Sequence, residues 1–268
     1  DQAISDSSIN GVGSDVLVAI ELAHLTGGDS ANSLDASGFS GNTTLEGGDG
    51  DDTLLGGSGI DLVLQTADAD QVLTTTSLTG LGQNTLDNID QAQLVGGDSD
   101  NLLDATAFAP GPVTLDGADG DDTLHGSAGD DQLFGGDGTD RVVSTGTTNQ
   151  LLTDNSVIAD SIDTLVEIEE AELFGSGADN VLDATAFSGD TTLHGSPGDD
   201  TLAGDDGNDT LNGGDGDDTI FGGQGADVLS GGAGSDRLVG HAGNDTMWGG
   251  ADQDLLFGGL GNDEMHGG

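Results

Sequence analysis

The C-terminal part of the chain decides the fold, because it repeats one nine-residue pattern without interruption. Residues 195–266 read GSPGDDTLA, GDDGNDTLN, GGDGDDTIF, GGQGADVLS, GGAGSDRLV, GHAGNDTMW, GGADQDLLF and GGLGNDEMH. Asp recurs at the sixth place of each unit, and Leu, Ile or Met recurs at the eighth. Eight consecutive units in one register exclude coincidence and predict a repetitive architecture in which each unit packs on its neighbours.

Shorter arrays of the same nonapeptide occur upstream. They lie at 47–64 (GGDGDDTLL, GGSGIDLVL) and at 117–143 (GADGDDTLH, GSAGDDQLF, GGDGTDRVV). Thirteen units in all cover 117 of the 268 residues. The glycines of each unit suit close backbone approach and positive φ. A strand of period two then sends the eighth residue inward and its neighbours outward.

A longer repeat is superimposed on the nonapeptides. Three copies of one segment, LTGGDSANSLDASGF from Leu25, LVGGDSDNLLDATAF from Leu94 and LFGSGADNVLDATAF from Leu173, each precede an array. The stretches before them also align and are rich in Thr, Val, Leu and Ile, which favours strands. We predict three modules, 1–64, 65–143 and 144–268, and expect the chain to be a piece of a longer tandem-repeat protein.

The composition requires an external source of positive charge. The 268 residues include 51 acidic residues, two arginines and no lysine, and the formal net charge is -49. With 33% hydrophobic residues, such a chain would remain unfolded by itself. So few cations exclude nucleic acid and anionic membranes as partners, and no apolar run is long enough to span a bilayer. Without cysteine there is neither a disulfide nor a thiolate metal site.

The acidic residues point to oxygen ligation of a metal. Of the 51, 44 are Asp and only seven are Glu, a bias expected where a short carboxylate folds back onto its own turn. Calcium accepts six to eight carboxylate and carbonyl oxygens. We therefore predict multiple Ca²⁺ ions as the cofactor that neutralises and folds the chain.

The units resemble the GGxGxDxUx nonapeptides of the RTX (repeats-in-toxin), or hemolysin-type, calcium-binding family. The resemblance implies an all-β fold, a right-handed parallel β-roll or β-helix solenoid. In it each GGxGxD half forms a turn, each xUx half forms a short strand, and two nonapeptides complete one coil. The linking segments are expected to continue the coil as irregular β-structure, with Phe39, Phe108 and Phe187 in the core.

The resemblance also implies the calcium ligands. Each ion is expected between turns of adjacent coils on one edge, held by aspartates eighteen residues apart, such as Asp200 with Asp218. The implied ligands are the sixth-position aspartates Asp52, Asp61, Asp122, Asp131, Asp140, Asp200, Asp209, Asp218, Asp227, Asp236, Asp245, Asp254 and Asp263. Two units depart from the pattern: His241 replaces a second glycine and Asp252 a fourth, which questions the turn geometry there.

Some residues admit two interpretations. Asn32, Asn101 and Asn180 occupy the sixth place in degenerate units, where an amide oxygen suits a turn residue better than a calcium ligand. The predicted core stack is formed by Leu202, Leu211, Ile220, Leu229, Leu238, Met247, Leu256 and Met265. On one outer face the ninth-position residues Ala203, Phe221, Val239 and Phe257 form an apolar row, which is either a partner surface or a product of cross-strand pairing alone.

No catalytic constellation is visible, since the five histidines are scattered and neither a P-loop nor an HExxH motif occurs. We therefore predict that the chain is not an enzyme. It is expected to be a calcium-binding structural segment of a large secreted or surface bacterial protein, such as a stalk, adhesin, surface layer or filament, with self-association as one form of partner binding. The resemblance implies type I secretion and folding on Ca²⁺ after export. The alternative is the C-terminal tail of an RTX enzyme or toxin.

Overall fold

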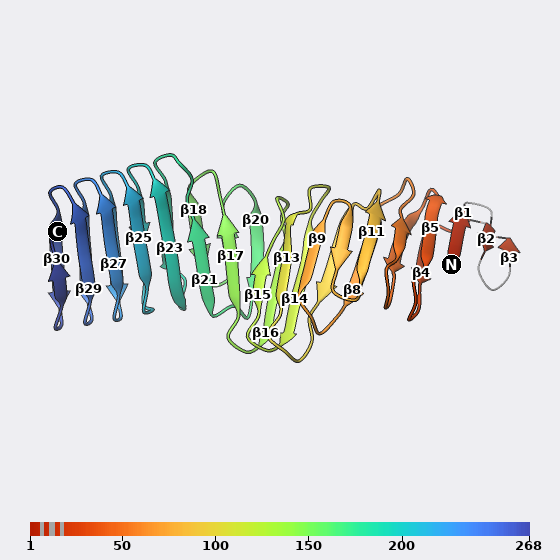
Figure 1. The fold of residues 1–268 in the computed structure, drawn as a ribbon, viewed down its shortest axis with the longest axis horizontal. Coiled ribbons are helices and arrows are strands. Elements are labelled where there is room, and N and C mark those ends of the chain that lie inside the picture. The colour runs from red at the N-terminus through yellow and green to blue at the C-terminus, as the bar shows by residue number, and fades with distance from the viewer. Residues whose placement is uncertain (6–7, 11–13, 17–18) are drawn as a thin grey trace. The chain divides into compact units, whose positions relative to one another are not determined.

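Within each part of the described chain, short β-strands lie side by side (Figure 1). The computed structural model describes residues 1–5, 8–10, 14–16 and 19–268, and none of these is helical. In this part of the chain, therefore, no helix could cross a membrane. Contacts divide the chain into two compact units, Asp1–Gly138 and Thr139–Gly268. The division into three modules, which is based on the sequence repeats, remains a prediction.

The first unit is a solenoid with two faces. One face is a parallel sheet of β4 (Leu22–Thr26), β6 (Asn42–Glu46), β8 (Asp61–Thr66), β12 (Gln91–Val95), β14 (Val113–Asp119) and β16 (Gln132–Asp137). The other face runs through β1 (Gln2–Ser5), β5 (Ser33–Gly38), β7 (Thr53–Leu55), β11 (Gln83–Asp87), β10 (Ser77–Thr79), β9 (Gln71–Thr74), β13 (Leu102–Ala107) and β15 (Thr123–His125). Beside β1 lie β2 (Ser8–Asn10) and β3 (Ser14–Val16).

The second unit repeats this plan. One parallel sheet contains β17 (Arg141–Thr145), β21 (Glu170–Phe174), β23 (Asp190–Pro197), β25 (Thr210–Asp215), β27 (Val228–Ala233), β29 (Thr246–Ala251) and β31 (Glu264–His266). The other runs through β20 (Ile162–Val166), β19 (Ser156–Ile158), β18 (Gln150–Thr153), β22 (Val181–Ala186), β24 (Thr201–Ala203), β26 (Thr219–Gln224), β28 (Arg237–Ala242) and β30 (Leu255–Leu260). The predicted all-β parallel solenoid is confirmed.

The linking segments contain the antiparallel pairings found among the described residues. The triplets β1–β2–β3, β9–β10–β11 and β18–β19–β20 are each a meander. The outer strands of the second triplet rejoin the coil in parallel, β11 with β7 and β9 with β13. The segments are therefore β-structure, as predicted, but each inserts a meander into one face rather than another simple coil.

The core is a single column of side chains between the two faces. The eighth-position residues from Leu202 to Met247 are fully buried, as are Phe39, Phe108 and Phe187, as predicted. The prediction is wrong for Met265, which is 51% exposed, and only partly right for Leu256, which is half-buried. These two lie on β31 and β30, which have a neighbouring coil on one side only, so their side chains are covered from one side.

Strands in the long array are longer than the three-residue xUx half implies. For example, β25 continues into the GGx of the next unit, where Gly214 pairs with Gly232 of β27. Because the backbones of successive glycine pairs bond to each other, only the fourth to sixth positions remain as a turn. At Gly232 a Cβ would lie 2.1 Å from the carbonyl oxygen of Gly214, so a side chain there would require the backbone to shift.

The two irregular units keep the turn geometry despite their side chains. His241 has φ 74° and Asp252 has φ 79°, where the regular units have left-handed glycines such as Gly232 and Gly234, with φ 115° and 134°. The doubt raised by the sequence is therefore resolved in favour of a regular turn. The backbone is strained at both residues, because L-residues disfavour this region.

We expect Asp252→Gly to stabilise the calcium-loaded protein by about 1 kcal/mol, because glycine relieves left-handed strain at a smaller entropic cost. Asp252→Asn is the matched control, since it removes the charge and keeps the Cβ. Thermal unfolding of both variants in calcium measures the difference. Equal stabilities of the two variants would contradict a backbone origin.

Candidate metal centre

Each of the thirteen predicted ligands is the last residue of a turn, and its carboxylate faces inward. Eleven are fully buried, none above 1% exposed, and Asp254 and Asp263 are half-buried. Aspartate is rarely buried unless it is paired, because desolvating a carboxylate is costly. Repeated burial of acidic groups therefore requires partners for their oxygens.

One carboxylate oxygen of each regular unit is bound to the backbone of the preceding coil. The N–H of Asp200 donates to Oδ1 of Asp218 at 2.8 Å, and the N–H of Asp218 donates to Oδ1 of Asp236 at 2.8 Å. On the opposite edge the N–H of Asp209 donates to Oδ1 of Asp227 at 2.9 Å. The structure thus brings together the same-edge aspartates, eighteen residues apart, that the sequence paired.

The second carboxylate oxygen of these units has no hydrogen-bond donor. Oδ2 is buried and unpartnered in Asp52, Asp200, Asp218, Asp227, Asp236, Asp245 and Asp254. In the unit of Asp218, the Oδ2 atom lies 2.1 Å from the position that a Cβ of Gly213 would take. The carbonyl oxygen of Gly231 lies 2.8 Å from the same Cβ position. The first glycine is therefore needed for space, not for positive φ, and two oxygens converge beside it.

We call this geometry the open turn, and it has a backbone signature. The second and fourth residues both have positive φ, as at Gly214 (120°) and Gly216 (138°). The same signature is found in the units that begin at Gly47, Gly117, Gly135, Gly195, Gly213, Gly222, Gly231, Gly240, Gly249 and Gly258.

The remaining units form a second geometry, which we call the closed turn. The second residue donates its N–H to the sixth side chain: Gly57 to Asp61 at 2.7 Å, Ser127 to Asp131 at 2.5 Å and Asp205 to Asp209 at 3.1 Å. Asn32, Asn101 and Asn180 accept the same bond from Gly28, Gly97 and Ser176 at 2.6, 2.9 and 2.6 Å. No second or fourth residue of these units has positive φ. The three asparagines thus act as turn residues.

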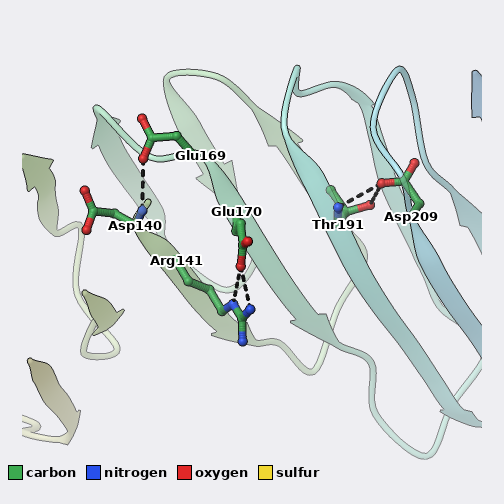
Figure 2. Close-up of polar contacts among 6 residues, drawn as sticks. All are labelled: Asp140, Arg141, Glu169, Glu170, Thr191 and Asp209. Atoms are coloured by element: carbon green, nitrogen blue, oxygen red, sulfur yellow. Dashed lines mark hydrogen bonds and ion pairs between the residues drawn. The ribbon is translucent and has the colours of Figure 1, made fainter. Parts of the chain in front are cut away.

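Two further features of the turns were missed by sequence reasoning. Fifth-position residues form a ladder of their own, in which Asp199 accepts from the N–H of Asp217 at 2.9 Å and Asp217 from that of Ser235 at 2.7 Å. The recurrence of Asp, Asn and Ser at that place was the available signal. A carboxylate of a linking segment also takes part in the bonds between sixth-position residues of successive coils, since Glu169 accepts from the N–H of Asp140 at 3.0 Å (Figure 2).

A family model describing four copies of the RTX calcium-binding nonapeptide repeat matches residues 37–71, 114–149, 185–220, 194–229 and 230–265. These ranges together make up more than half of the chain. The chain belongs to the RTX calcium-binding repeat family. No curated protein matches it. Calcium is therefore the cofactor of this RTX segment, whose β-roll is a structural calcium-binding domain.

The oxygens of the open turns fit this ion. Calcium takes carboxylate and carbonyl oxygens in flexible geometry, and the open turns offer an unpartnered carboxylate oxygen beside a backbone carbonyl. Among the described residues, no three carboxylate or imidazole side chains are grouped to hold a metal ion. An ion in these turns would be held by aspartates together with main-chain carbonyls, and would supply the positive charge that the RTX segment lacks.

Burial shifts the titration of the turn carboxyls. It raises the pKa of Asp218 and of Asp227 to about 7, against backbone hydrogen bonds that lower it, and neighbouring carboxylates raise it further. The pKa is raised by burial also in Asp52, Asp122, Asp131, Asp200, Asp209, Asp236 and Asp245. In the absence of metal, the folded RTX segment therefore retains protons that the unfolded chain releases.

The predicted apolar row lies on the outer face of β24, β26, β28 and β30. Ala203 pairs with Phe221, Phe221 with Val239, and Val239 with Phe257. The guanidinium of Arg237 lies 5.4 and 5.5 Å from the ring centroids of Phe221 and Phe257, within cation–π range. These contacts support the cross-strand interpretation, and binding of a partner to the row remains a prediction.

We expect Gly213→Ala to destabilise the calcium-loaded RTX segment by about 1–3 kcal/mol, because the new methyl group would overlap Oδ2 of Asp218. Gly177→Ala is the control, since no atom lies within 4 Å of a Cβ there. Thermal unfolding in calcium compares them. Equal losses for both variants would show that the first glycine is not needed for space.

The raised pKa values predict how pH acts on calcium-free protein. A carboxyl whose folded pKa exceeds its unfolded pKa stabilises the fold at low pH and loses that contribution as pH rises through the folded pKa. Protein passed over chelating resin should therefore hold more strand at about pH 5 than at about pH 8, by far-UV circular dichroism. The difference should persist in about 1 M salt, which screens exposed charges more than buried ones. More strand at the higher pH would contradict the account.

Proposed function

We propose that this RTX segment is a calcium-dependent structural part of a large secreted or cell-surface bacterial protein, serving as a stalk, adhesin spacer, surface-layer or filament subunit. The observation that carries the proposal is a row of buried carboxylate oxygens without donors, repeated in the open turns of Asp52, Asp200, Asp218, Asp227, Asp236, Asp245 and Asp254. At neutral pH, cations bound to these oxygens would remove the cost of burying the carboxylates in a rigid coil. We propose the open-turn aspartates as the ligands.

The thin core supports a need for calcium. Burying one side chain stabilises by about 1.5–3 kcal/mol, whereas ordering a residue costs about 1–2 kcal/mol. Each nine-residue unit of the long array contributes one core side chain, such as Leu211 or Leu229. Hydrophobic burial alone therefore does not offset the ordering of a unit, and ion binding adds to the hydrogen bonds between coils as a favourable contribution.

Calcium dependence suits export. Extracellular calcium modules bind with dissociation constants of about 10⁻⁴–10⁻³ M, so the chain would remain unfolded at low cytosolic calcium and fold outside the cell. RTX repeats are typical of secreted proteins. Mutual repulsion among 51 acidic residues favours the unfolded form until the ions bind.

The second candidate is the calcium-binding tail of a secreted RTX enzyme or toxin. The meanders β9–β10–β11 and β18–β19–β20 favour the structural role, because they recur between nonapeptide arrays in two modules. A tail needs only one contiguous array. The sequence that flanks the segment separates the two candidate functions. Further copies of the longer repeat would favour the structural role, and a hydrolase domain would favour the tail.

Calcium titration of the purified protein at neutral pH tests the proposal. We expect strand content, followed by far-UV circular dichroism, to rise cooperatively with a midpoint of about 10⁻⁴–10⁻³ M calcium. Magnesium is the control ion, because it demands a smaller octahedral site, and it should not substitute. Strand content that does not change with calcium, or that rises equally with magnesium, would contradict the proposal that calcium folds this structural segment.

A further inference from the structure

We propose that Asp131 and Asp209, although they occupy the sixth position of nonapeptides, are not calcium ligands but close the first turn of their run by hydrogen bonds. This inference rests on the proposed calcium binding at the open turns. It divides the predicted ligands into two classes that the repeat pattern does not distinguish.

All oxygens of Asp209 already have donors. Oδ1 accepts from the N–H and the hydroxyl of Thr191, both at 2.8 Å (Figure 2), and Oδ2 accepts from the N–H of Asp205 at 3.1 Å. In the next turn along that edge, Oδ2 of Asp227 is buried without a partner. A cation would therefore have to share or displace a hydrogen bond at whichever oxygen of Asp209 it bound.

Asp131 is satisfied in the same way. Its Oδ1 accepts from the N–H of Val113 at 2.7 Å, and its Oδ2 accepts from the N–H of Ser127 at 2.5 Å. The hydroxyl of Ser127 lies 3.0 and 3.1 Å from the two oxygens. Asp61 shares the closed turn but keeps an unpartnered Oδ1, so the inference does not extend to it.

Natural units of the same chain show that the closed turn needs no charge. Asn32, Asn101 and Asn180 hold it with an amide oxygen in place of a carboxylate. An amide is neutral, so the bond from the second residue is sufficient to order the turn. Asp131 and Asp209 have the backbone of these asparagine units and not that of the open units.

The position of the closed turns explains why they differ. The strand residues before Asp131 and Asp209 on their edges, Val113 and Thr191, follow the turns FAPGP and FSGD, which are not nonapeptides. An open turn instead stacks its second and fourth residues on the carbonyls of an earlier nonapeptide turn, as Gly223 does on Asp205 and Gly225 on Gly207. The first nonapeptide turn of a run lacks that support and closes on itself.

Four of the closed turns, those of Asn32, Asn101, Asn180 and Asp209, then supply the first donor of an open run. In each of these four, the backbone N–H of the sixth residue donates to the first open-turn aspartate on the same edge: Asn32 to Asp52 (2.8 Å), Asn101 to Asp122 (2.7 Å), Asn180 to Asp200 (2.7 Å) and Asp209 to Asp227 (2.9 Å). Calcium-independent turns thus present the template on which the calcium-dependent turns stack.

The test compares Asp209→Asn with Asp227→Asn, because the two residues are eighteen apart on one edge. Bound calcium is counted by native mass spectrometry and by isothermal titration, and folding is checked by circular dichroism in saturating calcium. We expect Asp209→Asn to bind as many ions as the wild type, with affinity within about twofold, since Asn180 shows that an amide closes such a turn. Asp227→Asn should lose at least one ion.

The outcomes are distinguishable. Loss of as many ions from Asp209→Asn as from Asp227→Asn, in a wild type that binds calcium, overturns this inference and leaves the proposed function standing. A wild type that takes up no calcium overturns the proposed function and this inference with it. Asp131→Asn provides an independent repeat, and its full complement of ions is expected.

Discussion

The buried carboxylate of the sixth-position aspartate is the constraint on which the rest of the structure depends. In Asp218, for example, one oxygen accepts an N–H from the preceding coil and the other has no donor. A carboxylate in this position is costly for a protein with a net charge of -49 unless a cation or a proton joins it. The raised pKa of Asp218 and Asp227 expresses the same cost. This cost is the physical basis of the proposed coupling between folding and calcium binding.

The glycines have two separate tasks around that carboxylate. The first, such as Gly213, leaves space for the second oxygen, whereas Gly214 and Gly216 adopt positive φ against the carbonyls of the coil before. The strands then need only a single column of Leu, Ile and Met between the faces. Because each coil contacts its neighbours alone, the solenoid can be extended by adding units, which is what a structural segment requires.

Much of this follows from the sequence, since the nine-residue period fixes which side chains point inward and which aspartates share an edge. The column from Leu202 to Met247 and the pairing of Asp200 with Asp218 are found where the pattern puts them. The two classes of turn could not be read in this way. Gly48 has φ 83°, whereas Gly28 and Gly57, each the second glycine of its unit, do not have positive φ. The geometry of a turn therefore depends on the preceding coil on which it stacks and not on the sequence of its own unit. The meanders were missed because residues that favour strands do not determine which neighbouring strand each one pairs with.

Anomalous scattering from crystals grown in calcium tests the central claim most directly. Data collected at long wavelength should show anomalous peaks between successive open turns, within about 2.3–2.6 Å of the second carboxylate oxygens, for example that of Asp218. The account predicts that these oxygens coordinate the ions while their partners keep the backbone hydrogen bonds. A fully folded coil whose second oxygens are bound by water or by main-chain N–H groups, with no anomalous peak near them, would contradict it.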